Sequence, residues 1–121
     1  MAGILRSVSA VRIFTRDLER ACRFYADVLD LERRSEGPGY VVFDLGGVDI
    51  VVEFVAPDDP EGDLLVGRLL AASFRVDDVD AAYRRLSQQG VPFDQPPERQ
   101  PWGGTLAFAR DPDSNVITLV G

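Results

Sequence analysis

Apolar residues alternate with polar ones near the start of the chain and then change to helical spacing. Residues 7–15 are rich in Val, Ile and Phe, which is typical of a β-strand. Asp17 is placed to cap a helix that follows the strand. The apolar residues of this helix recur at spacings of four, three and four: Leu18, Cys22, Tyr25 and Leu29. The pattern predicts a strand followed by an amphipathic helix with one face on a sheet.

Further strands complete the first half of the chain. Residues 31–35 read as a short extended stretch, and residues 40–45 and 48–56 read as two strands. Gly46 and Gly47 separate these two strands, and paired glycines between β runs favour a tight hairpin because its turn needs positive φ. We therefore expect the order strand, helix, three strands.

The second half repeats this order. A strand is predicted at 69–76, and Asp78 is placed to cap a helix that Gly90 ends. The apolar face of that helix consists of Val79, Ala82, Tyr83 and Leu86. Residues 92–101 carry four prolines and read as irregular, whereas 105–110 and 116–120 read as strands. An acidic, proline-rich linker at 57–65 separates the halves. We expect it to continue neither a helix nor a strand.

The two halves align residue by residue. Ala10 falls on Ala71 and Asp17 on Asp78, each at an offset of 61. Each half alone leaves an open sheet with a bare face that its partner must cover. We therefore expect an α+β fold, a single domain (1–121) of two βαβββ pseudo-repeats at about 5–57 and 66–121, with curved mixed sheets around a cleft.

Composition narrows the possible functions. A chain of 121 residues can bury a core without metals or disulfides. The net charge of −7 argues against nucleic acid and anionic membranes as partners, since both require clustered positive charge. No apolar run is long enough to span a bilayer and no signal peptide is visible, so we expect a cytoplasmic protein. The single cysteine, Cys22, lies on an apolar helix face, where we expect it to be buried.

Two motifs carry a resemblance to a known family. Residues 24–32 read FYADVLDLE and resemble the signature FYxDVLGLE, and Trp102-Gly103 followed by DPDSN at 111–115 resembles the signature WG…DPDGN. Both signatures belong to the vicinal oxygen chelate superfamily, which includes glyoxalase I, bleomycin resistance proteins and extradiol dioxygenases. The resemblance covers residues 7–120 and implies the tandem βαβββ fold.

The resemblance also implies four metal-ligand positions, which are commonly two histidines and two glutamates. These positions are occupied here by Ala10, Glu53, Ala71 and Thr118, and the chain contains no histidine. One carboxylate and one hydroxyl cannot hold a catalytic divalent ion, which needs several carboxylate or imidazole ligands. We therefore expect neither a metal nor another cofactor, and we do not expect the metal-dependent glyoxalase and dioxygenase activities.

Side-chain alternation selects the residues that would line the cleft. If the Gly46-Gly47 turn is a two-residue hairpin, the residues with the parity of Ala10 share one face of the first sheet, and those with the parity of Ala71 share one face of the second. The expected ligand-binding residues are Arg12, Phe14, Tyr40, Val42, Val51, Glu53, Ser73, Arg75, Trp102 and Thr118.

Several of these residues also have a purely structural interpretation. Glu53 could form an ion pair with Arg12 or Arg75 on the same face. Trp102 could form a cleft wall or pack within its own loop, and Phe14 and Tyr40 could contact a ligand or only pack on the sheet. Asp113 and Asn115 are interpreted as turn formers.

Metal-free members of the resembled family are typically drug-binding proteins, similar to bleomycin resistance proteins, and form dimers that share their clefts. The resemblance therefore implies a homodimer that binds an aromatic or cationic drug-like molecule, with antibiotic sequestration as the specific hypothesis. An alternative is a metal-free isomerase or lyase that uses Glu53 as its acid/base. A third possibility is a domain without a ligand.

Overall fold

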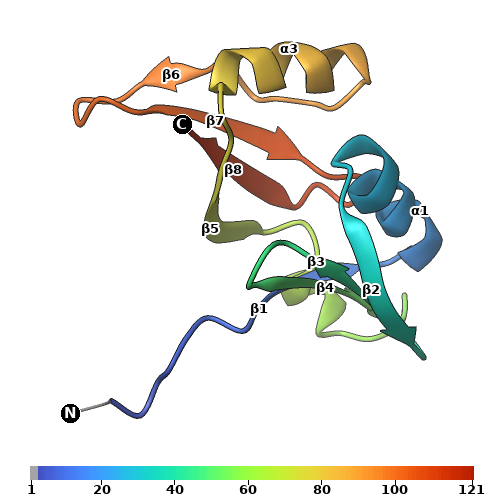
Figure 1. Ribbon diagram of the computed structural model, residues 1–121. Coiled ribbons are helices and arrows are strands. Elements are labelled where there is room, and N and C mark those ends of the chain that lie inside the picture. Colours follow the sequence, from blue (N-terminus) through green and yellow to red (C-terminus); the bar gives the residue numbers. More distant parts are fainter. Residues whose placement is uncertain (1–2) are drawn as a thin grey trace.

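The fold consists of two four-stranded mixed sheets. The computed structural model describes residues 3–121 (Figure 1). Sheet A has the order β1-β4-β3-β2, with β1 parallel to β4, and sheet B has the order β5-β8-β7-β6, with β5 parallel to β8. The strands of sheet A are β1 (Ala10–Thr15), β2 (Glu32–Gly37), β3 (Tyr40–Asp44) and β4 (Asp49–Phe54). Those of sheet B are β5 (Leu69–Arg75), β6 (Glu98–Arg99), β7 (Thr105–Arg110) and β8 (Val116–Val120). The predicted α+β class with tandem βαβββ modules is confirmed.

Capped helices follow the first strand of each module. The carboxylate of Asp17 accepts a hydrogen bond from the Arg20 backbone N–H (3.0 Å) at the start of α1 (Leu18–Arg23). The carboxylate of Asp78 accepts one from the Ala81 N–H (3.0 Å) at the start of α3 (Val79–Gln88). Both predicted caps are therefore confirmed. The first helix continues as a π-helical segment, η1 (Phe24–Val28), which its side-chain spacing did not predict.

The glycine pair forms the expected hairpin turn. Gly46 and Gly47 have φ of 65° and 94°, and the Leu45 N–H donates to the Val48 carbonyl (3.0 Å). Asp44 of β3 lies opposite Asp49 of β4 next to the turn, so the pairing of the two strands continues up to the turn. This turn fixes which residues of β3 and β4 share a face.

Two segments that were expected to be irregular contain short elements. The linker holds one helical turn, α2 (Gly62–Leu65), because the Asp59 carboxylate accepts from the Glu61 N–H (2.9 Å) and starts the turn after Pro60. The proline-rich segment 92–101 contributes β6, since Glu98 and Arg99 pair with β7 between its prolines. The linker was expected to form neither a helix nor a strand, and segment 92–101 was expected to be irregular, so both expectations were wrong at these positions.

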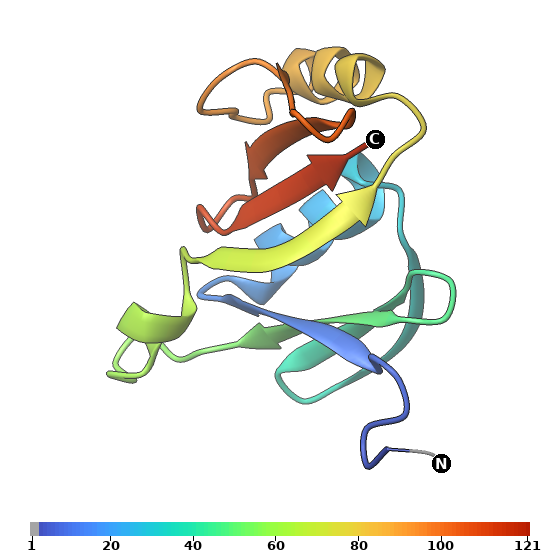
Figure 2. The ribbon, with the colours of Figure 1, turned by 90° about the vertical axis from the view of Figure 1, so that its left-hand side faces the viewer.

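The core lies between the sheets and the two main helices. Ile13, Phe43 and Val52 of sheet A and Tyr25 of η1 are completely buried, and Ala107 of β7 is nearly so. Figures 1 and 2 show α1 beside both sheets and α3 over sheet B. Cys22 is buried in this core, as predicted. No helix among residues 3–121 combines the length and the apolar composition needed to cross a membrane.

The turn 111–115 joins the two modules through buried side chains. The Asp113 carboxylate, only 2% exposed, accepts from the Thr15 hydroxyl (2.6 Å), the Arg16 N–H (3.1 Å) and Arg20 Nη2 (2.9 Å). Asp111 accepts a 2.7 Å bond from the Tyr25 hydroxyl. Each of these bonds links a residue of module 1 to the β7–β8 turn of module 2.

Asn115 is completely buried at the centre of this turn. Its amide nitrogen donates to the Phe14 carbonyl (3.0 Å) and to Asp111 (2.9 Å), and its amide oxygen accepts from the N–H groups of Gly67 (2.8 Å) and Arg68 (3.2 Å). Asp113 and Asn115 are therefore more than turn formers, because their side chains fix β1 relative to the second module. We refer to residues 111–115 as the clamp turn.

Candidate functional site

Sheet A presents one face that its own chain leaves uncovered. Arg12 and Tyr40 are exposed on this face, and Phe14, Val51 and Glu53 are half-buried. The register places Glu53 between Phe14 of β1 and Tyr40 of β3. It places Val51 between Arg12 and Val42 in the same way. The structure thus brings together six of the ten expected ligand-binding residues.

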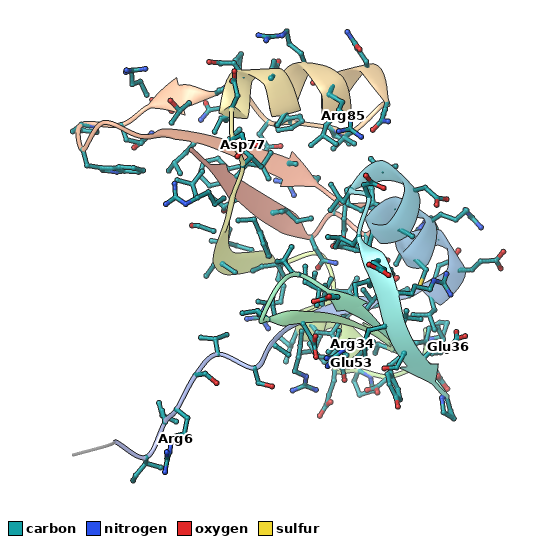
Figure 3. All side chains as sticks on the ribbon, viewed as in Figure 1. Arg6, Arg34, Glu36, Glu53, Asp77 and Arg85 are labelled. Carbon is teal, nitrogen blue, oxygen red and sulfur yellow. The ribbon has the colours of Figure 1, made fainter. Side chains whose placement is uncertain are left out.

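An arginine–glutamate pair lies in the middle of this open face. Arg12 Nε donates to Glu53 Oε2 (2.7 Å) and Arg12 Nη2 donates to Glu53 Oε1 (3.1 Å). The hydrogen bonds to Glu53 raise the pKa of Arg12 above its ordinary value. The Arg12 guanidinium also lies 5.2 Å from the centre of the Phe14 ring, within cation–π distance. Both oxygens of Glu53 are therefore engaged by a guanidinium, and Figure 3 shows Glu53 on the side of sheet A turned away from sheet B.

The corresponding face of sheet B carries Ser73, Thr118 and Phe108. Ser73 lies opposite Thr118, and Thr118 lies opposite Phe108 of β7. Thr118 is 6% exposed, whereas Ser73 is exposed. Phe108 shares this face and was missed by the sequence analysis, although its alternation with the buried Ala107 and Ala109 would have identified it.

Strand β5 is irregular around Ala71. Ala71 has a φ of 58°, and the pairing with β8 shifts between Leu69 and Ser73. The pairing is therefore irregular at this bulge, but exposure still alternates along β5, and Ala71, Ser73 and Arg75 are all exposed as expected. Arg75 itself lies beyond the bulge and is exposed.

Trp102 lies in the loop between β6 and β7 and is 64% exposed. Its ring covers Gly104, where an added Cβ would lie only 1.9 Å from an indole carbon. The residue therefore packs on its own loop and also keeps a free surface. Both earlier interpretations of Trp102 are compatible with this position.

The ten expected residues do not form one cleft within a single chain. Ile13 and Ile50 of sheet A, and Phe74 and Ile117 of sheet B, line a groove between the sheets. Because side chains alternate along a strand, Arg12, Glu53 and Thr118 point away from that groove. The expected residues on sheets A and B thus lie on two separate faces in one chain, apart from Arg75, which lines the groove.

The residues at the four family ligand positions do not fit a divalent ion. Ala10 lies opposite Asp49, whereas Glu53 lies opposite Phe14, so Ala10 and Glu53 are separated along the strands by roughly 13 Å. Neither alanine offers a donor atom, and Glu53 already binds Arg12. Among residues 3–121, no group of three or more His, Cys, Asp or Glu side chains is close enough to share an ion.

A match to a family model shows which superfamily the chain belongs to. The model of the Glyoxalase/Bleomycin resistance protein/Dioxygenase superfamily matches residues 7–119. The chain belongs to this superfamily. The vicinal oxygen chelate resemblance seen in the sequence motifs is thereby confirmed.

Individual proteins are also similar to the chain. The uncharacterized protein YraH of Bacillus subtilis (strain 168) is 32% identical over 124 residues, which cover 90% of this chain and 93% of YraH. A bleomycin resistance protein of Klebsiella pneumoniae is 29% identical over 113 residues, covering 88% and 85%. A superfamily member from Sphaerobacter thermophilus DSM 20745 has a crystal structure with a TM-score of 0.80 at 30% identity, covering 97% and 98%.

Proposed function

We propose that this superfamily member binds an aromatic or cationic drug-like molecule without a metal ion, and that antibiotic sequestration is its role. The observation that carries the proposal is the open face of sheet A. There Phe14, Tyr40 and Val51 surround a charged pair whose two members neutralise each other. Small-molecule sites typically combine apolar walls with a few orienting polar groups. The similarity to a bleomycin resistance protein supports the same reading.

The proposed site is completed by a second copy of the chain. One copy supplies the open face of sheet A, and its partner supplies Ser73, Arg75 and Thr118 from sheet B and Trp102 from the β6–β7 loop. A two-fold dimer would form two equivalent clefts of this kind. The separation of the two faces within one chain supports this arrangement, because neither face alone encloses a ligand.

Ligand binding is tested by the fluorescence of Trp102, the only tryptophan in the chain. EDTA-treated protein is titrated with bleomycin and with a panel of flat aromatic cations. The proposal predicts a saturable change in emission at micromolar concentrations for at least one class of compound. A flat response across the whole panel would show that the proposed binding function is wrong.

Two phenylalanines provide a matched pair of variants for the same titration. Phe14→Ala removes a wall of the open face, and we expect it to weaken ligand affinity about tenfold or more. Phe54→Ala removes the same side chain from the end of β4, where Phe54 is 43% exposed and has the opposite parity to Glu53. Affinity should change less than about threefold in Phe54→Ala. Equal losses in both variants would contradict a site on this face.

Charge at the site is tested by Glu53→Gln. The substitution leaves the Arg12 guanidinium without its anionic partner, so we expect cationic ligands to bind about tenfold more weakly and neutral aromatic ligands to be little affected. Stability should change little, because Arg12 is 64% exposed and an exposed ion pair contributes little. Product analysis on the same two proteins addresses the acid/base alternative. Turnover by the unaltered protein that is abolished in Glu53→Gln would replace binding by catalysis as the function.

A further inference from the structure

Two aromatic rings near strand ends lie directly against glycines. The Tyr40 ring covers Gly37, which lies opposite it in the β2–β3 hairpin, and the Trp102 ring covers Gly104 in the turn between β6 and β7. A Cβ added to Gly37 would lie 2.5 Å from the Tyr40 ring, and one added to Gly104 would lie 1.9 Å from the Trp102 ring. Only glycine therefore leaves room for each ring. We refer to Tyr40 and Trp102 as the seated rings.

Backbone conformation does not explain these two glycines. Gly39, Gly46 and Gly103 have φ of 78°, 65° and 101°, a region that favours glycine. Neither Gly37 nor Gly104 has a positive φ, so the backbone geometry would accept alanine at either position. A glycine in a strand also weakens it, because it has no side chain to pack. The space that each glycine leaves for a ring is therefore its particular contribution.

Both seated rings lie on the open faces of their sheets. Tyr40 belongs to the open face of sheet A described above. Gly104 directly precedes β7, and Phe108 of β7 lies opposite Thr118 on the open face of sheet B. Because side chains alternate along a strand, position 104 shares this face with Phe108. The indole of Trp102 covers position 104 and so forms part of the open face of sheet B, although its backbone lies in the loop.

The charged pair on the open face of sheet A is satisfied within that face. Arg12 binds both oxygens of Glu53 and lies 5.2 Å from the centre of the Phe14 ring. Tyr40 is 39% exposed and Trp102 is 64% exposed. The seated rings therefore offer free aromatic surface to a ligand, whereas the charges largely neutralise each other.

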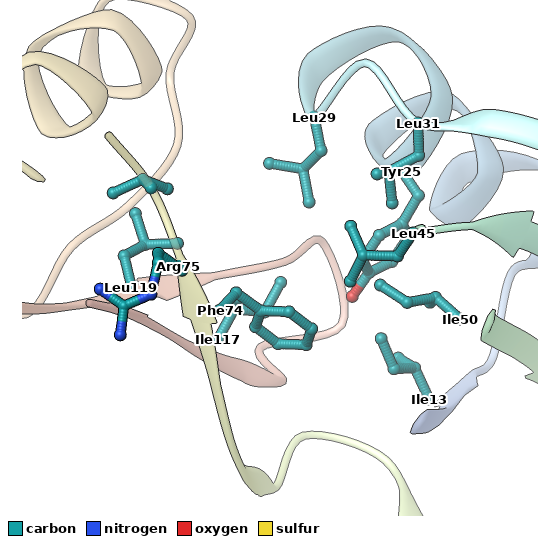
Figure 4. Close-up of a pocket in the computed structure, with 11 residues that line it drawn as sticks. Ile13, Tyr25, Leu29, Leu31, Leu45, Ile50, Phe74, Arg75, Ile117 and Leu119 are labelled. Atoms are coloured by element: carbon teal, nitrogen blue, oxygen red, sulfur yellow. The ribbon is translucent and has the colours of Figure 1, made fainter. Parts of the chain in front are cut away.

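The groove between the sheets does not offer a comparable aromatic site. Figure 4 shows Leu31, Leu45 and Ile50 around this groove, which has a volume of about 200 Å³. Sites for drug-sized molecules typically measure about 300–1,000 Å³. Among residues 3–121, those that line the groove include neither Tyr40 nor Trp102. The aromatic surface that a flat ligand could use thus lies on the open faces.

We propose that Gly37 and Gly104 are positioning residues, which seat Tyr40 and Trp102 so that the two rings stack on opposite sides of a planar, fused aromatic ligand. The inference rests on the proposed function, in which Tyr40 of one copy and Trp102 of its partner face the same cleft. It narrows the ligand class to molecules with a flat ring system, because aromatic rings stack in parallel, offset planes. A ring that is seated before the ligand arrives also loses less conformational freedom on binding.

Gly104→Ala tests the seat of Trp102. The added Cβ displaces the outer end of an exposed indole and leaves the backbone in place, so the Tm should not fall. In calorimetric titrations, we expect 9-aminoacridine, a planar monocation, to bind the variant about tenfold more weakly than the unaltered protein. Tetraphenylphosphonium, a monocation that is not planar, should lose less than about threefold. Equal losses for the two compounds would overturn the inference, because a general disturbance of the cleft weakens both.

A double-mutant cycle tests whether Gly104 acts through Trp102. Trp102→Ala removes the indole, so adding Gly104→Ala to it should not weaken 9-aminoacridine binding further. A further loss in the double variant would mean that position 104 acts independently of the ring, against the inference. Gly37→Ala, measured with and without Tyr40→Ala, gives the same cycle for sheet A and the same expected result.

The two compounds also separate this inference from the proposed function. If the unaltered protein binds tetraphenylphosphonium but not 9-aminoacridine, the inference is wrong and metal-independent drug binding stands. Full 9-aminoacridine affinity in Gly104→Ala would likewise contradict the inference alone. An unaltered protein that binds neither compound would also overturn it, whereas the wider panel followed by Trp102 fluorescence decides the proposed function.

Discussion

Asn115→Ala is expected to lower the free energy of unfolding by about 3–5 kcal/mol, because it removes four hydrogen bonds from a completely buried position. The Phe14 carbonyl and the N–H groups of Gly67 and Arg68 would lose their amide partner. A buried polar group without a partner costs more than the bond itself contributed. Urea unfolding at neutral pH measures this loss, which is a large share of the stability of a domain this size.

Ser114→Ala is the control for the clamp turn. Ser114 is exposed, has a φ of 66°, and its side chain makes no hydrogen bond among the described residues. Because Ala and Ser are similarly strained at this φ, the free energy of unfolding should change by less than about 0.5 kcal/mol. Comparable losses in the two variants would mean that the backbone of the turn, rather than the Asn115 side chain, joins the modules.

The loss of folding stability at alkaline pH should depend strongly on Tyr25. Burial, followed by the nearby carboxylates of Asp111 and Asp113, raises the pKa of Tyr25 well above its ordinary value. The stability from keeping its hydroxyl protonated is fully present below the unfolded-state pKa, near 10, and is lost as pH rises above that value towards the folded-state pKa. The free energy of unfolding should therefore fall by about 1.4 kcal/mol per pH unit in this range.

The composition leaves few other groups that titrate in this pH range. The chain has three tyrosines and one cysteine, and all its basic residues are arginine, so no lysine titrates near pH 10. Burial also raises the pKa of Cys22, so the reference protein and both tyrosine variants carry Cys22→Ala. Urea unfolding between pH 9 and 12 should show a smaller decline in Tyr25→Phe, whereas Tyr40→Phe, at an exposed position, should keep the full decline. An unchanged slope in Tyr25→Phe would contradict the prediction.

Local patterns predicted most of the fold. The caps at Asp17 and Asp78 and the Gly46-Gly47 turn depend on a few neighbouring residues, whose chemistry alone favours one backbone geometry. The sequence analysis missed the short α2 and β6 elements, because the prolines beside them obscure the helix and strand patterns. The clamp turn was read as local because its residues are turn formers, and nothing in its sequence reveals contacts with Thr15 or Tyr25 in the other module.

Prediction of which side chains share a face succeeded where strands were regular. The two-residue hairpin predicted correctly that Tyr40 and Glu53 lie on the same face of sheet A. The open face and the Arg12–Glu53 pair could therefore both be predicted from the sequence. The sequence did not reveal the bulge at Ala71, because a shift in register cannot be read from composition, although exposure still alternates along β5. The sequence also could not predict that the two open faces are separate within one chain, because this separation depends on how the modules pack.

Native mass spectrometry of EDTA-treated protein, with a ligand identified in the Trp102 titration, tests the central claim most directly, because it counts chains, ligands and metal ions in one particle. A metal-independent cleft shared by two copies predicts a dimer that takes up as many as two ligands and whose mass includes no metal ion. Ligand bound to single chains, or bound only together with an added divalent ion, would contradict the account.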